Sequence, residues 1–186
     1  MAADIDIVNA ALSKLGEQPL LAMTDASVPG RLANRTYEDI KDALVREFPW
    51  NFAMKRTSLA ADPVAPAWGF AYKFNLPGDC MRVVDIENDY NYDWRVEGGT
   101  IVTDLSAPLN IRYVGDVLEG AMEATFREAL AARLAMEWAE PLSATTSLAN
   151  SMATLYKNKL QVARAADGQE DRLRAIDVSL FIDSRY

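Results

Sequence analysis

The sequence of 186 residues contains no histidine and a single cysteine, Cys80. Without histidine the chain cannot build a Ser-His-Asp or Cys-His nucleophile system or an HExxH zinc site. One cysteine allows neither an internal disulfide nor a thiolate metal cluster, and it fits a reducing compartment. We therefore expect no metal site, no cofactor and no histidine-based catalysis.

Long apolar runs and phosphate-binding glycine motifs are also missing. No apolar run approaches the roughly 18 residues that a membrane helix needs, and the first residues lack the basic start of a signal peptide. The glycine pair Gly98-Gly99 matches neither the P-loop nor the dinucleotide-binding pattern. These features predict a protein that is made and used in a cytoplasm, without membrane contact.

Basic residues are outnumbered: 19 Lys and Arg stand against 27 Asp and Glu, so the formal net charge is −8. The basic footprint that is typical of nucleic-acid binding is therefore absent. Half of the residues are hydrophobic and a quarter are charged, which is typical of a globular protein of one domain or two small ones.

Helical periodicity marks both ends of the chain. A first helix is predicted over residues 4–15, with Asp4 as its cap and Gly16 as its end. A second is predicted from Pro29 to about residue 48, with Lys41 among the charged residues of its outer face. Two more are predicted near the other end, over residues 121–140 and 143–166, and Pro141 is expected to end the first of these.

The segment between the helices has the period of β-strands. Two glycines at 98–99 lie between strand-like runs and predict a tight hairpin. The whole segment predicts a small antiparallel sheet of short strands with one face exposed to solvent, from the runs 55–59, 70–74, 81–86, 93–97, 100–103 and 109–114.

Together these patterns predict an α+β, mainly helical fold. An antiparallel helix bundle is built from both chain ends, and a small antiparallel β-sheet is inserted in the middle. The predicted parts are a first helical half (1–48), a β insertion (49–120), a second helical half (121–166) and a C-terminal arm (167–186).

The C-terminal arm is rich in apolar residues for a chain terminus. Two interpretations stay open: the arm folds back on its own helices, or it docks on a neighbouring subunit or partner. In the second case the interface candidates are Leu180, Phe181, Ile182, Arg185 and Tyr186.

The segment 46–59 joins the first helical half to the β insertion and carries three large rings, Phe48, Trp50 and Phe52. On composition alone it predicts a hydrophobic plug between the two parts. Its pattern also resembles the phage head-to-tail adaptor family, which includes tail tubular protein A and packaged-DNA stabilisation proteins. The residues that carry the resemblance are Phe48-Pro49-Trp50-Asn51-Phe52-Ala53, Lys55-Arg56, Leu59-Ala60, Phe70-Ala71-Tyr72, Leu76-Pro77, Asp79-Cys80 and Arg82-Val83.

The resemblance implies a structural ring protein and no enzyme. Such a ring is commonly a dodecamer. It lies beneath the portal protein, extends the DNA channel, retains packaged DNA and receives the next tail or nozzle protein. Double-stranded DNA passes through without sequence-specific binding. The expected location is the head–tail junction of the virion, and the host cytoplasm during assembly.

Lys55 and Arg56 are further interface candidates because they follow the aromatic segment directly. In a ring each charge is repeated many times, so a modest basic spot becomes a charged belt. The overall acidity points away from tight DNA binding, since an acidic lumen repels the duplex and lets it slide.

Two alternatives stay open. Glu123, Glu137 and Glu140 lie on one predicted helix beside Trp138, which permits a tail-associated peptidoglycan hydrolase that uses carboxylates. The same acids also fit the solvated face of an ordinary helix. The other alternative is a soluble cytoplasmic domain that does not assemble.

Overall fold

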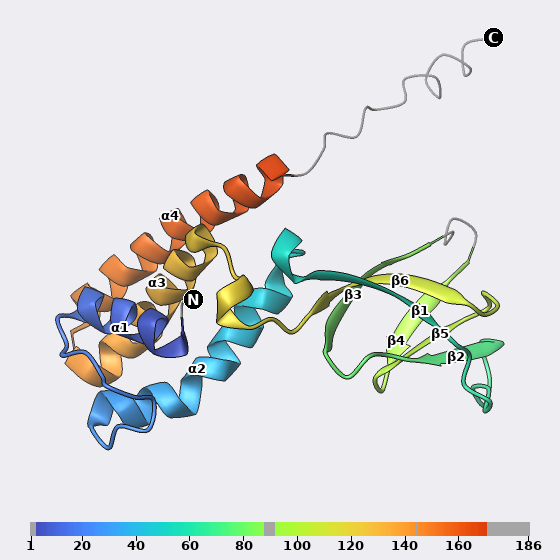
Figure 1. The fold of residues 1–186 in the computed structure, drawn as a ribbon, viewed down its shortest axis with the longest axis horizontal. Helices are drawn as coiled ribbons and strands as arrows, with labels where there is room; N and C mark the ends of the chain where they lie inside the picture. The colour runs from blue at the N-terminus through green and yellow to red at the C-terminus, as the bar shows by residue number, and fades with distance from the viewer. Residues whose placement is uncertain (1–2, 88–91, 144, 171–186) are drawn as a thin grey trace, which may run out of the picture.

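The computed structural model describes residues 3–87, 92–143 and 145–170. Within these ranges the fold is α+β and mainly helical, as predicted, with helices from both chain ends and strands between them. Figure 1 shows an elongated molecule in which a helical body occupies one end of the long axis and a β part occupies the other.

Helix α1 (Asp4–Leu15) ends as predicted at Gly16, whose φ of 76° lies in the left-handed region that glycine adopts without strain. Its beginning differs from the prediction that Asp4 is the cap. The extended residue before the helix is Ala3, and the Asp6 carboxylate accepts a hydrogen bond from its backbone N–H at 2.9 Å. Asp4 is therefore already inside the first turn.

Helix α2 (Val28–Glu47) begins after Ser27, whose hydroxyl accepts a hydrogen bond from a backbone N–H of the first turn. Lys41 was predicted on the outer face, and this is wrong because the residue is only 6% exposed. Its ammonium group lies 2.5 Å from the Glu38 carboxylate and 3.7 Å from that of Glu119. The buried charge is thus compensated by two carboxylates.

Helices α3 (Ala124–Ser143) and α4 (Thr146–Glu170) correct two predicted ends. Pro141 does not end α3, because so near the C-terminus a proline removes a single backbone hydrogen bond and the last turn still closes. Helix α4 continues past residue 166, so residues 167–170 belong to the helical body and not to the arm.

Helix α3 lies at the centre of the helical body and contacts each of the other three helices. Its alanines allow close approach, and its fully buried residues include Phe126, Ala129, Leu130, Ala132, Leu134, Ala135 and Trp138. Glu128 pairs with Lys159 at 2.6 Å, and the Arg133 guanidinium lies 5.3 Å from the Tyr156 ring centre. This register places α3 and α4 side by side in opposite directions.

The β part contains two antiparallel three-stranded sheets in the described residues, whereas the sequence predicted one. The first has the order β1-β6-β3 and the second the order β2-β5-β4. Their bounds are Met54–Leu59 (β1), Tyr72–Asn75 (β2), Cys80–Ile86 (β3), Trp94–Glu97 (β4), Thr100–Thr103 (β5) and Leu109–Gly115 (β6).

The first sheet is covered on both faces over part of its length, and the second sheet covers one of these faces. One face packs with the second sheet around a separate apolar core made of Phe74, Ile86, Ile101, Leu109, Ile111 and Tyr113. On the other face Val114 belongs to the core of the helical body. The periodicity of single strands cannot distinguish this arrangement from one half-exposed sheet.

The predicted hairpin is confirmed. Glu97 pairs with Thr100 across the two-residue loop between β4 and β5. Gly98 and Gly99 have φ values of 54° and 78°, which is the backbone that a tight hairpin turn of this kind requires. Among the described helices, none is long and apolar enough to span a membrane.

Candidate functional site

The helical body and the β part meet at the aromatic corner, which we define as Phe48, Trp50, Phe52 and Phe126. Trp50 is 1% exposed, and its indole N–H donates a hydrogen bond to the Leu44 carbonyl at 3.1 Å. The Trp50 ring centre lies 4.9 Å from that of Phe48 and 4.9 Å from that of Phe126, both edge to face. The corner is therefore the hydrophobic plug that the composition predicts.

Two arginines connect the end of α2 to strand β3. The Arg46 guanidinium donates to the Met81 carbonyl, and that of Arg82 donates to the Glu47 carbonyl at 3.4 Å. The last carbonyls of a helix have no partner within the helix, so Arg82 satisfies one of them. These contacts attach the first sheet to the helical body.

A third connection, the Asp167 clamp, joins α4 to the corner. The Asp167 carboxylate accepts a hydrogen bond from the Asn51 backbone N–H at 2.7 Å, and the Asn51 amide donates to the Asp167 carbonyl at 2.7 Å. Asp167 is only 3% exposed. Nearby, Arg164 pairs with Glu47 at 2.7 Å.

The sequence analysis missed the Asp167 clamp because the segment from 167 to 171 is polar and contains glycine. A signal was nonetheless present. Asp167 lies four residues after Ala163 and eleven after Tyr156, so it continues the inward stripe of α4. A polar residue on such a stripe needs a buried partner from elsewhere in the chain.

Lys55 lies at the junction, but its charge is used within the chain. Its ammonium group is 2.7 Å from the Asp79 carboxylate and donates to the Asp116 carbonyl at 2.9 Å. The hydrogen bond from Lys55 holds the pKa of Asp79 below its usual value. The Lys55 stem also covers Gly115, where an added Cβ would lie 2.6 Å from the lysine Cδ. Lys55 thus ties β1 to the turn before β3.

Arg56 points the other way. It lies opposite Arg112 in the ladder of β1 and β6, and Arg112 is neutralised by Asp85 at 2.6 Å. Arg56 is exposed, and no described residue forms an ion pair or hydrogen bond with its side chain. Of the two predicted basic candidates, Lys55 is paired within the chain, whereas Arg56 has no ion-pair partner among the described residues.

Glu123 is not brought near Glu137, and Glu140 lies one turn after Glu137 on the exposed face of α3. Glu137 pairs with Arg133 at 2.8 Å on the surface of α3. Glu123 precedes α3, and burial together with Glu170 and Asp167 raises its pKa. At about 1.5 Å per residue the two glutamates are roughly 20 Å apart along the helix. Glycosidase carboxyl pairs are separated by about 5–9.5 Å.

The arm candidates Leu180, Phe181, Ile182, Arg185 and Tyr186 lie outside the described residues. In the part of the chain that the structure describes, no group of three or more cysteine, aspartate or glutamate side chains is arranged to hold a metal ion.

No family model and no curated protein sequence matches this chain.

Proposed function

We propose that this chain is a structural head-to-tail adaptor of a tailed phage or phage-like particle. It assembles as a ring beneath the portal protein, extends the DNA channel, retains packaged DNA and docks the next tail component. In this proposal it acts at the head–tail junction of the virion and has no catalytic step.

The observation that supports the proposal is the position of the residues that carry the family resemblance. They are scattered over residues 48–83 in the sequence, and part of them lies at the junction of the two parts, whereas Phe70-Ala71-Tyr72 lie where the β1–β2 connection enters β2, at the far end of the β part. At the junction, Trp50 fills the aromatic corner, Lys55 pairs with Asp79, and Arg82 binds the end of α2. These three residues fix the β part to the helical body, which is where a ring subunit must be rigid.

The charge of the chain also supports a conduit. A net charge of −8 per copy makes a ring of many copies strongly acidic. Such a ring repels the phosphate backbone, so its wall does not bind DNA tightly and lets it slide. The separation of Glu123 from Glu137 gives no support to the hydrolase alternative.

The experiment is the native mass of the purified protein, alone and mixed with a purified portal ring encoded by the same genome, by light scattering after size exclusion. We expect the free chain, whose monomer mass is 20.6 kDa, to join the portal peak in about a dozen copies. A chain that stays out of the portal peak at every salt concentration tested would overturn the adaptor proposal. That result would favour the alternative of a soluble cytoplasmic domain that does not assemble.

A further inference from the structure

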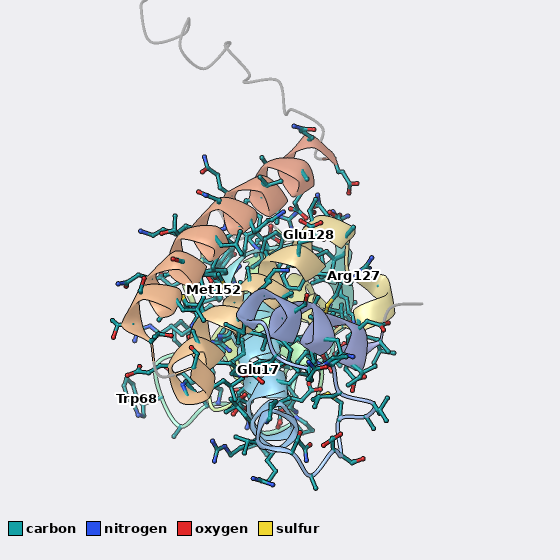
Figure 2. All side chains as sticks on the ribbon, turned by 90° about the vertical axis from the view of Figure 1, so that its left-hand side faces the viewer. Glu17, Trp68, Arg127, Glu128 and Met152 are labelled. Carbon is teal, nitrogen blue, oxygen red and sulfur yellow. The ribbon has the colours of Figure 1, made fainter. Side chains whose placement is uncertain are left out.

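A protruding apolar loop lies at the far end of the β part. It joins β1 to β2, and its residues 63–72 include no charged side chain. Trp68 is 88% exposed and Val64 is 67% exposed, although tryptophan is among the residue types that are most buried on average. Figure 2 shows Trp68 projecting from the edge of the molecule.

This loop is held at both of its ends. At one end the Asp62 carboxylate accepts hydrogen bonds from the Val64 backbone N–H at 2.8 Å and from the Asn75 amide at 3.0 Å. At the other end the Asp104 carboxylate accepts one from the Ala71 backbone N–H at 2.8 Å. A loop anchored in this way presents its tryptophan at little further entropic cost, as binding hot spots do.

A groove lies at the opposite end of the molecule, between α1 and the first half of α3. It is an open groove of about 270 Å³, in which the buried Ile7 and Ala131 are flanked by the exposed Ala10 and Ala124. Lys14 and Arg127 lie on its rim. Figure 1 places α1 and the loop before β2 at the two ends of the long axis, and in Figure 2 Arg127 and Glu128 lie beside α1.

The charges of the loop and the groove are complementary. At the base of the loop are Asp62, Asp104 and Lys73, which lies 3.6 Å from Asp62, so the base carries a net negative charge. On the rim of the groove Glu128 is neutralised by Lys159 at 2.6 Å. The charged residues of the lining, Asp6, Glu128, Lys14 and Arg127, sum to zero, so with Lys159 the groove carries a net charge of +1. A cation beside an indole face is favourable in addition.

We propose that the Trp68 loop of one copy docks into the α1–α3 groove of a second copy of this chain. Because the two surfaces differ and lie at opposite ends, the contact is heterologous and runs head to tail, the kind that builds rings or filaments. The net negative charge at the base of the loop disfavours an anionic bilayer as the partner of Trp68. The position of this contact in a ring rests on the proposed function. The docking of one copy on another does not, because it is a property of the free chain.

The test is the concentration dependence of the mass of the free protein, measured by sedimentation equilibrium. The wild type is expected to rise above 20.6 kDa as its concentration increases. Trp68→Ala removes the loop's anchor and Ala10→Glu places a carboxylate in the groove. Each is expected to lower the association constant by at least ~10-fold. Leu21→Ala, at another exposed apolar residue, and Ala165→Glu, at an exposed position on α4, are the matched controls and are expected to associate as the wild type does.

Mixing the two defective variants gives the sharpest result. The Trp68→Ala protein keeps its groove and the Ala10→Glu protein keeps its loop, so together they are expected to form dimers and nothing larger.

Acrylamide quenching of tryptophan fluorescence reports the same contact. Trp50 and Trp138 are 1% exposed and Trp94 is half-buried, so Trp68, at 88%, is the most accessible of the four tryptophans and is expected to become shielded on association.

A wild type that stays monomeric at millimolar concentration, or a Trp68→Ala variant that associates normally, would overturn the contact. So would shielding of Trp68 by phosphatidylcholine vesicles without self-association, which would assign the loop to a lipid surface. The adaptor proposal is judged separately. If the Trp68→Ala and Ala10→Glu proteins join the portal peak as the wild type does, the adaptor proposal stands and the ring does not need this contact. Self-association of a wild type that never binds the portal would keep the contact and remove the adaptor proposal.

Discussion

Lys41 and Asp167 are charged residues on inward helical faces, and each is buried because a distant segment supplies its partner. Lys41 meets Glu119, which follows β6, and Asp167 meets Asn51, which follows α2. An unpaired buried charge would cost far more than either contact contributes. Both residues therefore mark places where the helical body is closed by the segments that flank the β part.

Replacing Asp167 tests the clamp directly. Asp167→Ala leaves the Asn51 backbone N–H without its acceptor in a buried site, and we expect a loss of about 1–3 kcal/mol in the free energy of unfolding. Asp167→Asn keeps an oxygen at the acceptor position, so its loss should be smaller. Urea denaturation followed by circular dichroism measures both values. Equal losses for the two variants would show that the acceptor oxygen is not what stabilises the junction.

Among the elements, local signals set some ends and failed at others. Gly16 ends α1 and Gly98-Gly99 turns the hairpin because only the backbone of these residues matters there. Pro141 and the polar segment after Ala166 failed as end signals. Pro141 removes only one backbone hydrogen bond in the last turn of α3, and α4 continues past Ala166 because Asp167 is bound by Asn51.

The hairpin offers a test at this scale. Gly99→Ala places a Cβ at a φ of 78°, and we expect it to destabilise the protein by about 1–2 kcal/mol, although no atom lies near enough to clash. Gly78→Ala is the matched control, because it also faces open space but its φ lies outside the left-handed region. Thermal or urea unfolding compares the two variants. A Gly99→Ala protein as stable as the control would exclude backbone strain at the turn.

Over the described residues the molecule has two apolar cores, one in the helical body and one between the two sheets. They are joined by the aromatic corner, the two arginine contacts and the Asp167 clamp. The C-terminal arm follows directly on α4, whose last turns carry that clamp. Whatever docks the arm is therefore close in the chain to the residues that set the orientation of the β part.

Deletion of residues 171–186 tests the arm. We expect an unchanged melting temperature, because the truncated chain keeps α4 and the Asp167 clamp. The interpretation in which the apolar arm docks on a partner predicts loss of attachment to the portal ring. Size exclusion with the portal ring and a thermal melt give the two measurements. A longer deletion that begins at Arg164 should lower the melting temperature as well. Normal attachment by the shorter deletion would remove the arm from the interface.

The sequence by itself determined the α+β class, the order of helices and strands, the hairpin and the apolar nature of the corner. Each of these depends on a residue and its near neighbours: the spacing of apolar side chains, the freedom of glycine, the size of three aromatic rings. Tertiary structure alone decided the division into two sheets, the burial of Lys41 and Asp167, and the opposite roles of Lys55 and Arg56. Those outcomes depend on which distant atoms are in reach, and neither periodicity nor composition records that distance.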